Sequence, residues 1–299
     1  MIYLLYMKLI SMRKTKDFII KYITEIMFLC MLILVAINLL NNLLPNGIFM
    51  SESSEASPES EQTMSDNSCN VKGITLHGDI YTYDSPETYD EKDKMVTDQT
   101  SADTVIANLD RANSNPNIKA IIVEIDSSGG SPVAGEEIMR AFKESKKPVI
   151  AFVRNMALST AYLGATGADI IFASPFSDVG SIGITMSYLQ NTEKNRKDGL
   201  EYIMLSSGKY KDAGSPDRAL TQDEKSLFMR DIDISHKYFV KLVSENRGLS
   251  IDKVNKLADG SSVLGEMALK EGLIDKIGTF QDVKKYVSGE IDEDVSICW

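Results

Sequence analysis

Few side chains in this 299-residue sequence are of the kinds that most often carry enzyme chemistry at neutral pH. There are two histidines, His77 in an early strand-like run and His236 in a helical stretch, and three cysteines, none of them in a CxxC spacing. Zinc sites are built from such side chains at short spacings, so their scarcity argues against a metal centre. We expect neither a metal nor a cofactor, and little opportunity for a histidine base.

Positive charge is scarce as well. The formal net charge is −11, and the region after residue 70 has no basic stripe. Nucleic-acid binding needs clustered lysine and arginine, because these side chains release counterions from the phosphate backbone. We therefore exclude nucleic acid as a partner. Composition also excludes a disordered chain, since 43% of the residues are hydrophobic, and it allows one sizeable domain with appendages.

The cysteines leave two interpretations open. Cys30 lies in an apolar run, whereas Cys69 and Cys298 stand on either side of the region that we expect to fold. If that region lies outside the cytoplasm, a disulfide between these two is chemically possible. Two unpaired thiols in loose ends are the alternative, because the sequence does not reveal how far apart the two residues lie.

One long hydrophobic run predicts a membrane anchor. Residues 26–44 include no charged side chain and are long enough to cross the roughly 30 Å core of a bilayer as a helix. A basic tail, residues 1–25, precedes the run, and no lysine or arginine follows it until Lys72. The positive-inside rule then places the amino terminus in the cytoplasm and the rest outside the cell membrane. A cleaved secretion signal is the alternative, but no A-x-A site is present.

The next segment, residues 45–70, is acidic and rich in serine. It includes few large apolar side chains, so it cannot bury enough surface to offset the entropy of ordering. We expect a flexible stalk between the membrane and the domain.

From Val71 onward, short apolar runs alternate with amphipathic ones. Strand-like runs such as KAIIVEID and PVIAFV are separated by helical patterns such as SADTVIANLDRAN and VAGEEIMRAFKES. This alternation predicts a parallel sheet covered by helices. Helical patterns at 221–246, 251–257 and 265–271 predict a carboxy-terminal helical extension. We place the domain at 71–287 and a tail at 288–299.

A glycine pair follows one of the predicted strands. In EIDSSGGSPVAGEEI the strand is expected to end at Asp126 and a helix to begin near Pro132, with Gly129 and Gly130 between them. Glycine permits positive φ and close backbone approach, so the peptide N–H groups of this pair are suited to bind an oxyanion. The alternative is a plain turn between strand and helix.

Two serines and a lysine complete the candidate site. Ser159 opens a segment rich in alanine and glycine, Ser181 lies in the glycine-flanked turn SDVGSIGITM, and Lys211 follows Lys209 in SSGKYKDAGSPDRALT. A serine hydroxyl needs a neighbouring base, and a desolvated lysine amine can serve. The alternatives are a helix N-cap for the first serine and solvated surface charges for the lysines.

These motifs, in this order, resemble the signal peptide peptidase A family of serine peptidases, which share the fold of the Clp protease and crotonase superfamily. The resemblance runs from about Val71 to Val287 and includes the later stretch DGSSVLGEMALKEGLIDKIG. It implies an α/β crotonase- and Clp-protease-like fold, a repeated ββα spiral with a C-terminal helical extension, here preceded by one transmembrane helix.

The resemblance also implies roles for the candidate residues. Ser159 would be the nucleophile, Lys211 the general base and Ser181 the group that orients the lysine amine. The oxyanion site would comprise the N–H groups of Gly130 and Thr160, with Gly129 shaping the backbone. Because lysine must be neutral to accept a proton, an alkaline optimum is expected. Implied partners are peptide substrates, such as signal-peptide remnants, and further copies of the chain in a homo-oligomeric ring, where the dyad of some members is completed across subunits.

The sequence departs from the family at two places. Thr160 and Ala161 follow the serine where the family usually has glycine, and Ser128 stands where proline is common. We expect the N–H of Thr160 to remain available and its branched side chain to crowd the cleft. The departure leaves open an inactive member that binds peptides or acts as a scaffold at the membrane. An acyl-CoA enzyme of the crotonase type is a weaker alternative, since acyl-CoA is not supplied outside the cell.

Overall fold

The computed structural model describes residue 31 and residues 69–84 and 98–299. The predicted basic tail, transmembrane segment and stalk lie outside the described residues, except for Met31, Cys69 and Asn70. Among the residues that are described, no helix combines the length and the apolar character needed to cross a membrane.

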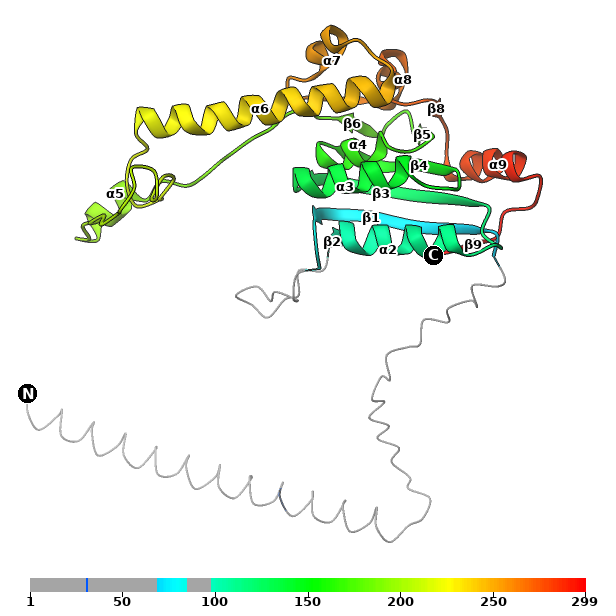
Figure 1. Ribbon diagram of the computed structural model, residues 1–299, viewed down its shortest axis with the longest axis horizontal. Coiled ribbons are helices and arrows are strands. Elements are labelled where there is room, and N and C mark those ends of the chain that lie inside the picture. Colours follow the sequence, from blue (N-terminus) through cyan, green and yellow to red (C-terminus); the bar gives the residue numbers. More distant parts are fainter. Residues whose placement is uncertain (1–30, 32–68, 85–97) are drawn as a thin grey trace, which may run out of the picture. The chain divides into compact units, whose positions relative to one another are not determined.

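The described strands form one sheet, which runs in the order β2-β1-β3-β4-β5-β8 (Figure 1). All neighbours along this path are parallel, as the repeated strand–helix alternation predicts. β6 pairs with the end of β4, β7 pairs antiparallel with β6, and β9 pairs with the start of β1. The strands are β1 (Val71–Tyr81), β2 (Gln99–Ser101), β3 (Ala120–Gly130), β4 (Val149–Leu158), β5 (Ile170–Ala173), β6 (Asp178–Gly180), β7 (Ser262–Leu264), β8 (Lys276–Ile277) and β9 (Ile297–Cys298).

Helices cover both faces of this sheet. The first six described helices are α2 (Ala102–Ser114), α3 (Pro132–Lys143), α4 (Thr160–Ala165), α5 (Thr192–Lys197), α6 (Gln222–Arg247) and α7 (Ile251–Leu257), and α8 (Gly265–Glu271) and α9 (Phe280–Ile291) follow. One hydrophobic core joins the strands to α2, α3, α4 and the inner face of α6, and a second joins the opposite face of the sheet to α9. The site described below lies where the first core meets the carboxyl ends of β3 and β4.

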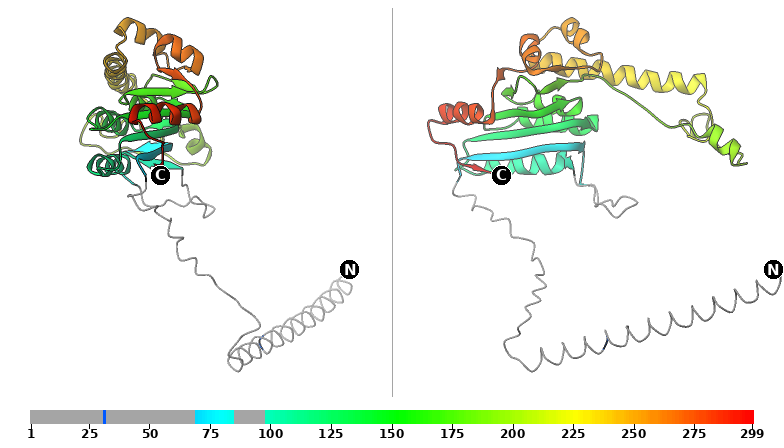
Figure 2. Two further views of the ribbon diagram at one scale, coloured as in Figure 1. Left: turned by 90° about the vertical axis from the view of Figure 1, so that its right-hand side faces the viewer. Right: turned by 180° about the vertical axis from the view of Figure 1, so that it is seen from behind.

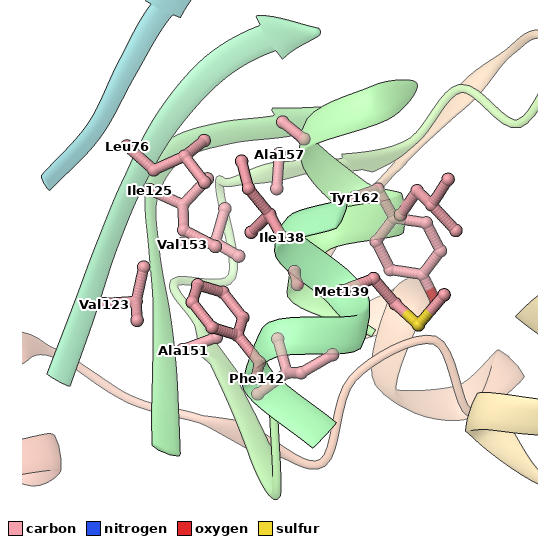
Figure 3. Packing of buried hydrophobic residues seen from close by; sticks show 14 of the residues in the cluster. Leu76, Val123, Ile125, Ile138, Met139, Phe142, Ala151, Val153, Ala157 and Tyr162 are labelled. Atoms are coloured by element: carbon pink, nitrogen blue, oxygen red, sulfur yellow. The ribbon is translucent and has the colours of Figure 1, made fainter. Parts of the chain in front are cut away.

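The first core shows why α3 sits where it does. Ile138, Met139 and Phe142 recur at helical spacing and are buried against strand side chains, and Tyr162 of α4 packs beside them (Figure 3). Each such apolar side chain, once fully buried, stabilises the fold by about 1.5–3 kcal/mol. The Tyr162 hydroxyl donates a hydrogen bond to the Leu273 carbonyl at 2.9 Å, so this buried polar group is satisfied.

The predicted helical extension is confirmed. The helix predicted at 221–246 is α6, which begins with a capping box between Thr221 and Glu224 and ends at Gly248, whose φ of 62° suits glycine. α7 and α8 occupy the predicted ranges 251–257 and 265–271. The caps at both ends of α6 explain why the sequence pattern located this helix well.

The predicted end of a strand at Asp126 is wrong. β3 continues to Gly130 after a register shift between Ile125 and Ser127, and its last residues pair with Asp79 and Ile80 of β1. The glycine pair therefore lies at the end of a strand and not in a turn. Glycines usually weaken strands, but here the neighbouring β1 backbone approaches too closely for a side chain.

The structure decides between the two interpretations of the cysteines. Cys69 and Cys298 form a disulfide, with 5.8 Å between their Cα atoms. β9 pairs with the first residues of β1, and the Trp299 ring lies where a side chain at Gly73 would stand. The boundary predicted at residue 287 falls inside α9, and the residues beyond it pack as part of the domain.

Candidate active site

Ser159 lies at the junction between β4 and α4. Its backbone has φ 51° and ψ −119°, a combination that costs free energy for any residue other than glycine. Its N–H donates a hydrogen bond to the Gly180 carbonyl at 2.7 Å, and its side chain makes no capping bond to α4. Ser159 thus stands at the N-cap position of α4, but its hydroxyl does not serve as a cap. A sharp strand-to-helix turn of this kind presents a nucleophilic hydroxyl in other hydrolases.

The glycine pair lies directly against this junction. A Cβ atom placed on Gly129, whose φ is 113°, would stand 3.0 Å from the Ser159 Cβ and 3.2 Å from the Thr160 backbone nitrogen. A side chain on Gly130 would collide with the Ile80 carbonyl oxygen. Only glycine allows this approach, so the end of β3 is held beside the serine and beside the first N–H of α4.

The side chain of Thr160 does not crowd the cleft, contrary to the sequence-based expectation. Thr160 is only 2% exposed, and its hydroxyl donates a hydrogen bond to the Gly130 carbonyl at 3.0 Å. Its methyl group packs where a side chain at Gly135 of α3 would stand. Because α4 begins at this residue, the side chain points inward against α3 and away from solvent.

Ser181 lies next to the same junction, one residue after the Gly180 carbonyl that accepts the Ser159 N–H. Its φ of 50° is again unusual for a residue with a side chain. Its hydroxyl donates a hydrogen bond to the Gly260 carbonyl at 2.9 Å, and its N–H donates to the Ser261 carbonyl at 3.0 Å. Within one chain, Ser181 therefore binds the backbone of the loop between α7 and β7. Among the described residues, its hydroxyl is not bonded to a lysine.

Lys211 is not brought to Ser159 within the single chain. It lies in the segment 183–221 between β6 and α6, hereafter the arm, which also includes α5. Figures 1 and 2 show α5 beside the amino-terminal end of α6, away from α4. No residue from 185 to 211 is buried, and Lys211 is exposed. Among the described residues, the Lys211 ammonium has no hydrogen-bond or ion-pair partner.

The two lysines of the arm differ in their surroundings. The Lys209 ammonium donates to the Asp223 carboxylate at 2.6 Å and lies over the Tyr210 ring at 5.0 Å from its centroid. The hydrogen bond to Asp223 raises the pKa of Lys209 above its ordinary value, which keeps it charged. A charged amine cannot accept a proton, so Lys209 is the poorer candidate for a base.

An ion-pair network holds the chain just after Lys211. The Arg218 guanidinium donates to the Asp212 carboxylate at 2.9 Å and also to the Glu224 carboxylate at the start of α6. Tyr202 donates to the other Asp212 oxygen at 2.8 Å. Arg218 and then the Thr221 N–H and hydroxyl lower the pKa of Glu224 to about 2. Our sequence-based reasoning missed this network; the close spacing of opposite charges in KDAGSPDRALTQDE was the available signal.

Neither histidine is bonded to the serine. The His77 ring lies 3.3 Å from the Glu124 carboxylate, and the His236 ring is 2.8 Å from the Ala258 carbonyl oxygen. Both rings thus contact groups other than Ser159. Lysine stays the base that the sequence predicts.

Two family models match the folded region. The model of peptidase family S49 matches residues 141–292, and the model of the Clp protease family matches residues 93–178. Both matches include the Ser159 junction. The first also includes Lys211, and the second includes the glycine pair. Together with the parallel sheet, they show an α/β fold of the Clp protease type.

Several of the relatives that this chain is similar to are named as proteases. A "Putative protease" of Methanocaldococcus jannaschii is 38% identical over 179 residues, which are 59% of this chain and 58% of the relative. A "Putative signal peptide peptidase SppA" of Enterococcus faecium is 27% identical over 74% of this chain and 64% of the relative. "Protease 4" of Salmonella typhi is 32% identical over 60% of this chain and 29% of the relative. The chain therefore spans less than two thirds of the length of each of them.

A solved structure of a ClpP1 mutant from Listeria monocytogenes is also similar. The match has a TM-score of 0.46 and 17% sequence identity, and it covers 70% of this chain and 92% of the Listeria chain.

Proposed function

Because the chain belongs to peptidase family S49, we propose that it is a membrane-anchored serine endopeptidase with Ser159 as nucleophile and Lys211 as general base. The observation that carries this proposal is the strained junction at Ser159, where a serine without a capping role stands beside Gly129 and the first N–H of α4. Backbone strain of this kind persists where the surrounding structure enforces it, and it is concentrated at functional sites.

The proposed reaction gives each of these groups one step. The Ser159 hydroxyl oxygen attacks the carbonyl carbon of a peptide bond, and neutral Lys211 accepts the hydroxyl proton. The carbonyl oxygen becomes an oxyanion, which the N–H groups of Gly130 and Thr160 stabilise. The C–N bond then breaks, and Lys211 returns the proton to the leaving amine. Water hydrolyses the resulting ester by the same steps and regenerates Ser159.

We further propose that Lys211 serves the Ser159 of a neighbouring copy in a ring. Lys211 lies in the exposed arm and away from α4, so one chain does not assemble the dyad. The arm also exposes large apolar side chains, a feature that marks a surface covered by a partner: Leu189, Leu200, Ile203, Met204 and Leu205. A contact between the arm of one copy and the site of the next is head-to-tail, and such contacts close into rings.

The membrane anchor and its orientation are part of the same proposal. The uncharged run at residues 26–44 and the basic residues before it support a single span with a cytoplasmic amino terminus. The Cys69–Cys298 disulfide supports an extracytoplasmic domain, because disulfides persist outside the reducing cytoplasm. Protease added to intact spheroplasts should remove the domain; protection until lysis would reverse the orientation.

The proposed substrates are signal-peptide remnants or other membrane-associated peptides. Support comes from a relative named signal peptide peptidase and from the anchor, which would hold the domain near such peptides.

We also propose the repeated ββα spiral for the fold in detail. β4 supports it by pairing with β5 through its first half and with β6 through its last residues, so that the strand changes partner between Val153 and Met156.

Mutation of the nucleophile tests the proposal. The full-length chain in detergent should cleave casein and react covalently with a fluorophosphonate, and Ser159→Ala should lower cleavage by about 10⁴-fold or more and remove the label. Ser288→Ala, in α9, is the matched control and should retain both. Labelling that persists in Ser159→Ala would show that another residue is the nucleophile.

A mixing experiment tests the dyad across subunits. Ser159→Ala and Lys211→Ala chains, each inactive alone, should recover roughly a quarter of wild-type activity when co-assembled, because one site in four then has both intact residues at a head-to-tail contact. No recovery would place the dyad within one chain.

A peptide-binding scaffold without activity is the second candidate. The threonine and alanine after the nucleophile and the distance of Lys211 from α4 in a single chain favour it. It predicts peptide binding by the assembled protein with no hydrolysis and no fluorophosphonate label.

A further inference from the structure

Thr160 follows the nucleophile, yet its side chain turns away from the reacting position. The hydroxyl donates its hydrogen bond to the Gly130 carbonyl at 3.0 Å, and the methyl group is buried against α3. A buried hydroxyl without an acceptor is costly, so this contact has a defined direction. Thr160 therefore connects the start of α4 to the end of β3.

The Gly130 carbonyl shares a peptide plane with the Ser131 N–H. That N–H donates to the Ile80 carbonyl of β1 at 2.7 Å. Thr160 on one side and Ile80 on the other thus fix the plane that follows Gly130.

The plane that precedes Gly129 is fixed as well. The Gly129 N–H donates to the Ser127 hydroxyl oxygen at 3.1 Å, and the same hydroxyl donates to the Gly78 carbonyl at 2.5 Å. Ser127 is 1% exposed, and the bond from the Gly129 N–H is buried, where water does not compete for it, whereas the bond to Gly78 is partly buried.

The Gly130 N–H belongs to the peptide between these two planes. Glycine on both sides widens the range of orientations open to that peptide, so its orientation depends on the pairing with β1 and on the two planes beside it. We propose that Thr160 is a positioning residue: its buried hydroxyl, acting with Ser127, holds the glycine pair so that the Gly130 N–H points at the oxygen of the carbonyl attacked by Ser159. This inference rests on the proposed peptidase function.

The residue type explains why the role is particular to this chain. The resemblance to the family implies glycine after the nucleophile, and glycine has no hydroxyl to make this bond. In this chain, α4, the helix that follows the nucleophile, also holds the oxyanion donor in position through Thr160. The orientation of that donor matters because its hydrogen bond must reach the oxyanion and not the ground-state carbonyl.

Two substitutions separate the hydroxyl of Thr160 from its packing. Thr160→Val keeps the shape and removes the hydrogen bond, whereas Thr160→Ser keeps the hydroxyl and removes the methyl. Loss of a whole oxyanion donor costs about 10²–10³ in kcat, so a misdirected donor in Thr160→Val should lower kcat by roughly 10- to 100-fold with KM nearly unchanged. Thr160→Ser should restore most of kcat. Fluorophosphonate labelling of Ser159 should slow in parallel.

Two further variants guard against a purely structural effect. Thr166→Val, at the other end of α4, removes a buried hydroxyl that donates to the Leu163 carbonyl at 2.6 Å and should lower Tm without a selective loss of kcat. Ser127→Ala removes the hydroxyl that accepts the Gly129 N–H, and it should reproduce the loss of kcat even if Thr160→Val folds poorly.

Three outcomes would overturn the inference. They are wild-type kcat in folded Thr160→Val, equal losses in Thr160→Val and Thr160→Ser, and unchanged kcat in Ser127→Ala. Failure of the proposed function gives a different pattern, because Ser159→Ala would then match wild type.

Discussion

The surroundings of Ser159 and the arm that carries Lys211 are opposite in character. Thr160 is 2% exposed and Ser127, near the end of β3, is 1% exposed, and both side chains are hydrogen-bonded, whereas Leu205 in the arm is 94% exposed and Ile203 is 73% exposed. The nucleophile and the oxyanion donors can thus be positioned within one chain, because buried contacts fix them. No such contact fixes Lys211 among the described residues, because residues 185–211 of the arm are all at least partly exposed. This difference is what the proposed ring, in which a neighbouring copy completes the site, would account for.

Within the arm, the largest effect is expected from Lys211, because the arm matters for chemistry only if this amine reaches a serine. Lys211→Ala should lower kcat by roughly 10²- to 10⁴-fold, as for loss of a general base. Its Tm should stay unchanged, because the side chain is exposed and unpartnered in the single chain. Lys209→Ala, the matched control, should be mild, and Ser181→Ala should fall between the two. Steady-state kinetics with circular dichroism check this, and the reverse ranking of the lysines would assign the base to Lys209.

The arm's apolar surface is expected to have the next largest effect. Leu205→Glu places a charge in the surface that we assign to a neighbouring copy, so it should dissociate the oligomer and lower activity in proportion. The fold should be unaffected, since an exposed substitution changes stability by within about 0.5 kcal/mol. Light scattering after size exclusion measures the assembly. Leu269→Glu on α8 is the control, because Leu269 is exposed and lies outside the arm. Equal dissociation of the oligomer by both variants would show that the arm is not the particular contact between copies.

A smaller effect concerns the anchoring of the arm on α6. The pKa of Glu224 is about 2 in the folded chain, below its ordinary 4.5, because Arg218 and Thr221 bind the ionised form. A lowered pKa means that this contribution to stability is fully present above about pH 4.5 and is lost as the pH falls from 4.5 towards 2. Glu224→Gln should therefore lower the urea midpoint at pH 7 and differ less from wild type at pH 3.

The matched control for that experiment is Glu245→Gln on the same helix. Glu245 is exposed and lies 3.7 Å from the Lys241 ammonium, so its removal should matter little at either pH. A gap between Glu224→Gln and wild type that stays constant from pH 7 to pH 3 would show that the charge of Glu224 does not anchor the arm.

The smallest effect on activity is expected from the disulfide. Cys298→Ser should lower the free energy of unfolding by about 2–5 kcal/mol, as for loss of a native disulfide. Activity at 25 °C should remain near wild type, because Cys69 precedes the first residues of β1, whereas the glycine pair contacts the far end of that strand at Asp79 and Ile80. Thermal unfolding and kinetics with and without reductant measure both. A fall in kcat in folded Cys298→Ser would couple the two ends of β1.

Much of the fold was predictable because its signals are local. The long helix predicted at 221–246 differs from α6 by one residue at each end, since Thr221, Glu224 and Gly248 cap it through contacts close in sequence. The alternation of apolar runs likewise predicted the parallel sheet. The continuation of β3 to Gly130 was missed, because pairing with β1 across about 50 positions outweighs the poor strand propensity of glycine.

The sequence supplied candidate residues for the site but not their geometry. Ser159 and Gly129 lie in contact because Ser159 follows β4, Gly129 lies at the end of β3, and these two parallel strands end at the same edge of the sheet. The direction of the Thr160 side chain was predicted wrongly, because it depends on the packing of α4 against α3. Ser181 binds the Gly260 carbonyl, a residue distant in sequence, which no local pattern signals.

The sequence by itself determined the family, the order of strands and helices, and the residue types that the proposed chemistry needs, because motifs, caps and apolar periodicity are written in neighbouring residues. Only the tertiary structure decided that Cys69 pairs with Cys298, that Thr160 faces inward to the Gly130 carbonyl, and that Lys211 lies in an exposed segment between β6 and α6. Each of these depends on distances between segments far apart in sequence, and such distances are set by packing.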